Sequence, residues 1–93
     1  MICMHCRIRV VDFLKWKAAM EGDADAQRQA GMRLIHLWRS VDDPNAAFFV
    51  LEVHDAEKAR AFVNPASVAE ASKAAGVLEF EWHIVESVEG YSA

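Results

Sequence analysis

The chain has 93 residues, of which 54% are hydrophobic and 26% charged, and its formal net charge at pH 7 is −4. This length suits one domain over residues 1–93, and the hydrophobic fraction excludes a disordered chain. The charge forms no basic stripe and no apolar run approaches about 20 residues, so we expect neither a nucleic-acid partner nor a membrane span. Because residues 1–10 alternate polar and apolar side chains and do not resemble a signal peptide, we expect a cytoplasmic protein.

The first element expected is a strand over about residues 2–10, where apolar and polar side chains alternate with the period of two that strands have. Asp12 is a suitable N-cap for a helix that follows. Three apolar residues of this helix recur at helical spacing: Phe13, Trp16 and Met20. Asp23 can cap a further helical piece, and a second strand is expected over about residues 33–41.

Residues 42–45, Asp-Asp-Pro-Asn, are the strongest turn signal in the chain, because Asp and Asn bond to nearby backbone and Pro fixes φ. They join the second strand to a third over about residues 46–54, so we expect a hairpin. A second helix should begin after Asp55, break at Pro65 and restart. The last strand is expected over about residues 77–87.

The order strand, helix, strand, strand, helix, strand is typical of a ferredoxin-like α+β fold. In this βαββαβ arrangement a four-stranded antiparallel sheet carries its two helices on one face, and the first and third strands are central. Side chains of a strand point alternately to the two faces, so the apolar set should pack on the helices. The other face is left uncovered by this chain.

The uncovered face collects titratable side chains. Each of the four histidines falls in a different strand, on its more polar side: His5, His36, His54 and His83. Imidazole titrates near neutral pH, which makes histidine a ready general acid and base. We expect His5 beside Arg7 and His54 beside Glu52, so that each proton acceptor has a charged partner.

Apolar residues are expected on the same face: Trp38, Phe48, Val50 and Val85. A monomer would expose them as a patch, and such patches mark interfaces or ligand sites. Two sheets packed face to face would bury the patch and enclose the space between them. We therefore expect a homodimer, since symmetric dimers are the commonest oligomers.

The order of elements, the short turn between the second and third strands and the kinked second helix resemble the dimeric α+β barrel superfamily. Three segments are similar to its small antibiotic-biosynthesis-monooxygenase-like members: residues 12–17 (DFLKWK), 38–45 (WRSVDDPN) and 74–77 (AAGV). The resemblance implies a homodimeric barrel. It specifies a fold better than a reaction, because proteins that share a fold commonly differ in their chemistry.

These features predict a small cofactor-independent enzyme of the monooxygenase-like, isomerase or cyclase kind, which acts on a hydrophobic and preferably aromatic small molecule. A histidine would be the acid or base, and Arg7 would stabilise an oxyanion. The predicted catalytic residues are His5, His54 and Arg7. The predicted substrate-binding residues are Trp38, Phe48, His36, Glu52 and His83. The alternative is a non-catalytic small-molecule-binding or sensor homodimer, or a purely structural dimer.

No metal or other cofactor is expected. The strand order spreads the histidines across the sheet, with His5 and His54 as near neighbours and the other two far apart. Cys3 and Cys6 point to opposite faces of one strand, so their thiols cannot chelate a single metal ion.

Two further alternatives stay open. Haem-degrading members of the superfamily use an Asn, a Trp and a His around the haem, and this chain has Asn45 and Trp38 at a spacing that does not match. In several members the pocket lies between the sheet and the helices. In this chain such a pocket would be lined by residues such as Phe13, Leu37 and Phe49.

Overall fold

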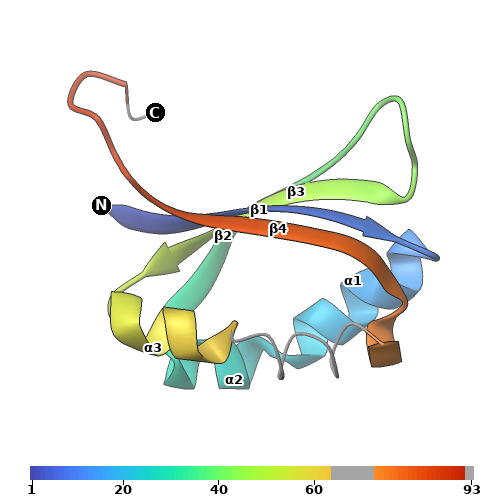
Figure 1. Ribbon diagram of the computed structural model, residues 1–93, viewed down its shortest axis with the longest axis horizontal. Helices are drawn as coiled ribbons and strands as arrows, with labels where there is room; N and C mark the ends of the chain where they lie inside the picture. The colour runs from blue at the N-terminus through green and yellow to red at the C-terminus, as the bar shows by residue number, and fades with distance from the viewer. Residues whose placement is uncertain (64–72, 92–93) are drawn as a thin grey trace.

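The computed structural model describes residues 1–63 and 73–91. In this part of the chain four strands form one sheet, and the helices lie on one side of it (Figure 1). The strands are β1 (Ile2–Val10), β2 (Met32–Arg39), β3 (Ala46–Val53) and β4 (Val77–Glu86). The helices are α1 (Phe13–Gly22), α2 (Ala24–Gln29) and α3 (Ala56–Phe62). The helix break predicted at Pro65 lies outside the described residues.

The strand order in the sheet is β2-β3-β1-β4, and each neighbouring pair is antiparallel. β1 and β3 are therefore central, as the βαββαβ pattern predicts. The α+β ferredoxin-like fold is confirmed. Residues of β1 alternate between the two faces: Met4, Cys6, Ile8 and Val10 are buried on the helix side. We call the opposite side the open face; it carries Cys3, His5, Arg7, Arg9 and the residues paired with them.

Capping aspartates set where the helices begin. The Asp12 side chain accepts a hydrogen bond from the Lys15 amide at 3.1 Å, which satisfies one of the free N–H groups of α1. The Asp55 side chain accepts hydrogen bonds from the Glu57 and Lys58 amides at the start of α3. Asp23 occupies the N-cap position of α2, as predicted, but its side chain makes no capping hydrogen bond. None of the described helices has the length and apolar character that a membrane span requires.

The predicted turn between β2 and β3 also holds the start of α1. The Ser40 amide donates to the Ala46 carbonyl at 2.9 Å, and the Asn45 amide donates to Asp43 Oδ1 at 2.9 Å. Asn45 Oδ1 in turn accepts from the Phe13 amide at 3.2 Å. The Asn45 side chain, which the haem alternative would need, is thus used to join the turn to the first helix.

An aromatic cluster forms the centre of the core between sheet and helices. The ring centroids of Trp16 and Phe13 are 5.9 Å apart, and those of Trp16 and Phe49 are 5.5 Å apart. Phe80 of β4 extends the cluster, with its centroid 6.4 Å from that of Phe49. These tilted pairs connect α1 to both a central and an edge strand, which fixes the helix on the sheet.

Candidate functional site

A row of three histidines crosses the open face. His36 of β2 pairs with Val50 of β3, Val50 pairs with His5 of β1, and His5 pairs with His83 of β4. His54 follows the end of β3, four residues beyond Val50, which places it about 13 Å along the sheet from His5. The prediction that His5 and His54 are near neighbours is therefore wrong, because the register sets His83 opposite His5.

A shallow depression lies over the middle of this face. Its volume is about 220 Å³, and it is lined by His5, Arg7, Phe48, Glu81 and His83. Four of these are predicted site residues, so the structure brings half of the predicted set together. Glu81 is an addition to the predicted catalytic and substrate-binding residues, although its alternation with His83 along the last strand places it on the open face.

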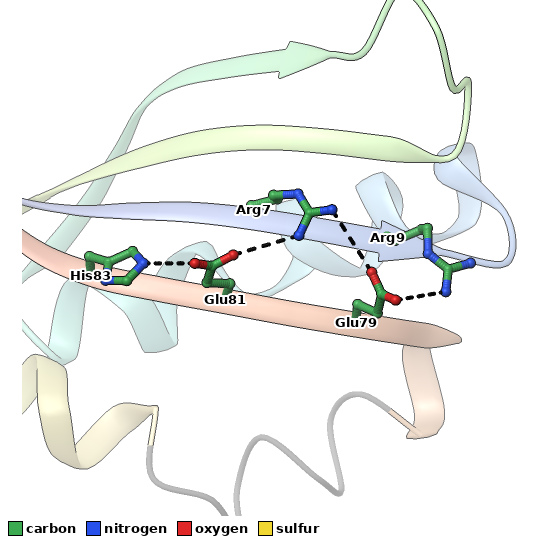
Figure 2. A network of polar contacts seen from close by, with 5 residues as sticks. All are labelled: Arg7, Arg9, Glu79, Glu81 and His83. Atoms are coloured by element: carbon green, nitrogen blue, oxygen red, sulfur yellow. Dashed lines mark hydrogen bonds and ion pairs between the residues drawn. The ribbon is translucent and has the colours of Figure 1, made fainter.

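Charged side chains beside the depression form one network (Figure 2). Glu81 accepts a hydrogen bond from His83 Nε2 at 3.0 Å, and its other oxygen lies 3.6 Å from Arg7 Nη1. Glu79 bridges Arg7 and Arg9, at 4.0 and 3.0 Å. The hydrogen bond from His83 lowers the pKa of Glu81, and the hydrogen bond from Arg9 lowers that of Glu79. Arg7, the predicted oxyanion partner, is therefore already paired with two carboxylates.

The remaining predicted residues lie outside the depression. His36 and Trp38 stack on each other, with ring centroids 5.0 Å apart and an angle of 17° between the planes. Glu52 lies 2.8 Å from His54 Nε2 and 3.3 Å from Arg33 Nη2. His54 thus has the carboxylate neighbour that the sequence predicts. Among the described residues no cluster of three or more metal-ligating side chains is found.

A larger cavity lies between the sheet and the helices, and we call it the helix-side cavity. Its volume is about 520 Å³, within the range of roughly 300–1,000 Å³ typical of small-molecule pockets. Four aromatic residues line it: Trp16, Phe49, Phe62 and Phe80. Of the three residues that the sequence suggests for such a pocket, Phe49 lines the cavity and Phe13 and Leu37 do not.

Polar groups are few in this cavity. Within the described part of the chain they are Asp23 and Gln27, both from α2 or its cap, and the thiol of Cys6. Burial raises the pKa of Cys6 to about 12, so the thiol stays protonated at neutral pH. Nothing in the sequence marks Gln27 as a site residue, because a glutamine in a short polar helix is ordinarily exposed.

The sheet separates the predicted site from the helix-side cavity, and the predicted aromatic residues Trp38 and Phe48 lie on the same face as the histidines. The histidines and Arg7 lie on the open face, whereas the aromatic walls enclose the helix-side cavity. No histidine is among the residues found to line the helix-side cavity in the described ranges. A ligand held there contacts β1 through Met4, Cys6 and Ile8, on the side of the strand opposite to His5.

Solved structures with the same arrangement include a Bordetella bronchiseptica protein proposed to be an antibiotic biosynthesis monooxygenase, with a TM-score of 0.74 and 19% identity over 94% of this chain and 96% of that one. SnoaB from Streptomyces nogalater, a cofactor-independent oxygenase solved as a point mutant, has a TM-score of 0.71 and 18% identity over 99% of this chain and 97% of that one. This chain shares their fold. The predicted resemblance to the antibiotic-biosynthesis-monooxygenase-like barrels is thereby confirmed at the level of the fold.

A third structure, of a Deinococcus radiodurans protein also proposed to be an antibiotic biosynthesis monooxygenase, has a TM-score of 0.67 and 15% identity over 100% of this chain and 98% of that one. The likeness therefore extends over whole chains. No protein-family model matches the sequence, and no curated protein matches it either.

Proposed function

We propose that this protein is a small cofactor-independent enzyme that binds a hydrophobic, aromatic small molecule in the helix-side cavity. The observation that carries the proposal is the cavity itself, about 520 Å³ of space with aromatic and aliphatic walls. Aromatic walls favour a flat aromatic ligand, because offset-stacked and edge-to-face contacts add to the gain from burying apolar area. The ligand would lie against the rings of Trp16 and Phe49.

The reaction class is supported by the fold shared with SnoaB, a cofactor-independent oxygenase. A cofactor-free oxygenation can convert an activated CH₂ group and O₂ into a carbonyl and water, so that no separate reductant is consumed. Its first step removes a proton from the substrate, as isomerisation and cyclisation also do. Within the described part of the chain one carboxylate lines the cavity, that of Asp23. It is a candidate for the base.

The sequence assigns this proton transfer to a histidine, and that assignment depends on the open face. We propose that the open face forms a homodimer, in which a second copy covers the depression beside His5. Trp38 and Val85 support this, because 50% and 42% of their surfaces are exposed there. The protein would then be a homodimer, and we propose a cytoplasmic location for it. His5 and Arg7, enclosed between the two copies, could act on a second, smaller substrate group.

Oxygen uptake by the metal-free protein tests the proposal, with phenols of one to three fused rings as substrates. Ala19 lines the cavity from the surface of α1, so Ala19→Trp should fill it and lower the rate more than tenfold. Ala18→Trp is the matched control, because Ala18 is an exposed neighbour outside the cavity. Equal rates in both variants would contradict the assignment of the cavity.

A second variant separates the two faces. If a histidine is the base, His5→Ala should abolish turnover and remove the limb of the pH–rate profile that reports its ionisation. If the base lies in the cavity, His5→Ala should retain the wild-type profile, and Asp23→Asn should lose it. Loss of activity in His5→Ala with the fold and the dimer intact would move the reaction to the open face.

A non-catalytic ligand-binding or sensor dimer is the second candidate. The observation that favours it is the sparse polar lining of the cavity, which in the described residues has one carboxylate and one amide side chain. A binding site needs only shape and a few polar contacts, whereas acid–base chemistry needs a positioned base. Tight binding of phenols without oxygen uptake or product formation would support this candidate over the enzyme.

A further inference from the structure

Gln27 is the exception in the core of this protein. Only 7% of its surface is exposed. Among the residues that the structure describes, Gln27 is the one buried residue with a polar side chain. It lies on α2 and lines the helix-side cavity among apolar neighbours. Burying an amide is costly unless its donors and acceptor find partners, so such a group needs a physical account.

The protein itself supplies little to this amide. Gln27 Nε2 lies 3.6 Å from the sulfur of Met20, and a thioether is a weak acceptor. The Gln27 side chain has two N–H donors and a carbonyl acceptor to satisfy. Within the described residues, the contact with Met20 is its one hydrogen bond. Gln27 is among the residues that line the helix-side cavity, so a ligand held there lies next to its side chain.

We propose that Gln27 is the polar anchor of the cavity and that it selects aromatic ligands carrying a neutral hydroxyl or carbonyl group. This rests on the proposed function, since it presumes that the helix-side cavity binds the ligand. Nε2–H donates to the ligand oxygen in place of the weak contact with Met20, and a ligand hydroxyl donates back to Oε1. A phenol satisfies both atoms of the amide with one group, and an aryl ketone satisfies the donor.

The charge of the lining restricts the class further. Asp23 lines the same cavity, and no lysine, arginine or histidine is found among its described lining residues. A carboxylate on the ligand would therefore leave water for an apolar cavity with no cation to compensate it. The cavity is expected to prefer neutral phenols and ketones over aromatic acids of the same size.

Three probes of one shape test the inference by titration calorimetry: naphthalene, 2-naphthol and 2-naphthoate. Wild-type protein should bind 2-naphthol more tightly than naphthalene and bind 2-naphthoate most weakly. Gln27→Leu keeps the volume of the side chain and removes its hydrogen bonds, so it should weaken 2-naphthol about tenfold and leave naphthalene within about twofold. Gln29→Leu is the matched control on the exposed side of the same helix and should change neither.

A second measurement uses the wild-type protein and does not depend on the folding of a variant. The Gln27 side-chain NH₂ signals in the nitrogen–proton spectrum should shift further on addition of 2-naphthol than with naphthalene, because a hydrogen bond adds to the ring-current shift that both probes cause. Equal weakening of both probes in Gln27→Leu, or equal shifts of these signals with both probes, would overturn the inference while leaving the cavity as a binding site. Failure of the wild-type protein to bind any of the probes would overturn the proposed binding site as well.

Discussion

Arg9 of β1 and Glu79 of β4 face each other across the sheet, with 3.0 Å between Arg9 Nη2 and Glu79 Oε1. This hydrogen bond lowers the pKa of Glu79 below its ordinary 4.5 and raises that of Arg9. A carboxyl group with a lowered pKa stabilises the fold at pH values above its unfolded pKa. That stabilisation is lost as the pH falls through the lower, folded value.

The first prediction concerns acid stability. Arg9→Gln should lower the free energy of unfolding at pH 6 and have a smaller effect at pH 3, because the stabilisation is lost as the pH falls through the lowered pKa of Glu79. Both side chains are about half exposed, so the difference at pH 6 should be small and should shrink in 1 M salt. Urea unfolding at the two pH values measures it, with Lys15→Gln as an exposed control. A difference of the same size at both pH values would mean that Arg9 acts through packing.

The second prediction concerns the thiols. Because burial raises the pKa of Cys6 to about 12, roughly one molecule in ten thousand carries the thiolate at pH 8. In a Cys3→Ala variant, labelling by Ellman's reagent at pH 8 should therefore be slow and should follow the rate of unfolding. Added urea should accelerate it. Rapid labelling in the absence of denaturant would contradict the burial of Cys6.

The third prediction compares two capping positions. Asp55 accepts from the backbone amides of Glu57 and Lys58, at 3.1 and 3.2 Å, so Asp55→Ala should destabilise the protein by about 1 kcal/mol. Asp23 stands at the same position of α2 without a side-chain bond, so Asp23→Ala should cost less than half as much. Thermal or urea unfolding of both variants measures the difference. Equal losses would show that the capping bond of Asp55 contributes nothing.

The fourth prediction concerns assembly. The wild-type protein should be a dimer at micromolar concentration in sedimentation velocity, and Trp38→Asp should shift it to the monomer by placing a charge on the open face. Leu14→Asp is the control, because Leu14 is 70% exposed on α1, away from that face. A wild-type monomer, or equal dissociation in both variants, would refute the open-face dimer.

Much of the fold follows from local patterns in the sequence. Strand alternation predicts all four strands to within two residues at each end, as for residues 33–41 against the observed Met32–Arg39. Asp12 and Asp55 mark helix starts because their side chains compete for free backbone N–H groups at those positions. These features depend on neighbours in the chain, and a period of two or a cap is visible without any knowledge of tertiary structure.

The candidate site is harder to predict from local sequence patterns. Which histidine lies opposite His5 depends on strand register, and shifting a pairing by a few residues exchanges one partner for another. The faces of β1 and β3 are predicted correctly, whereas register shifts interrupt the alternation in β2 at Ile35 and at the start of β4. A period of two also assigns no position along the sheet. The helix-side cavity lies between the sheet and residues of α1, α2 and α3, which are far apart in the sequence. Gln27 is therefore significant only once that space is known.

A titration of the methyl-labelled protein with 2-naphthol, followed by carbon–proton NMR, tests most directly whether the helix-side cavity binds the ligand. We predict that the methyl signals of Met4, Ala19 and Met20, which line this cavity, shift in proportion to occupancy. The signals of Val50 and Val85, on the open face, should stay in place. Shifts confined to Val50 and Val85 would contradict the proposed binding site and place the ligand beside the histidines.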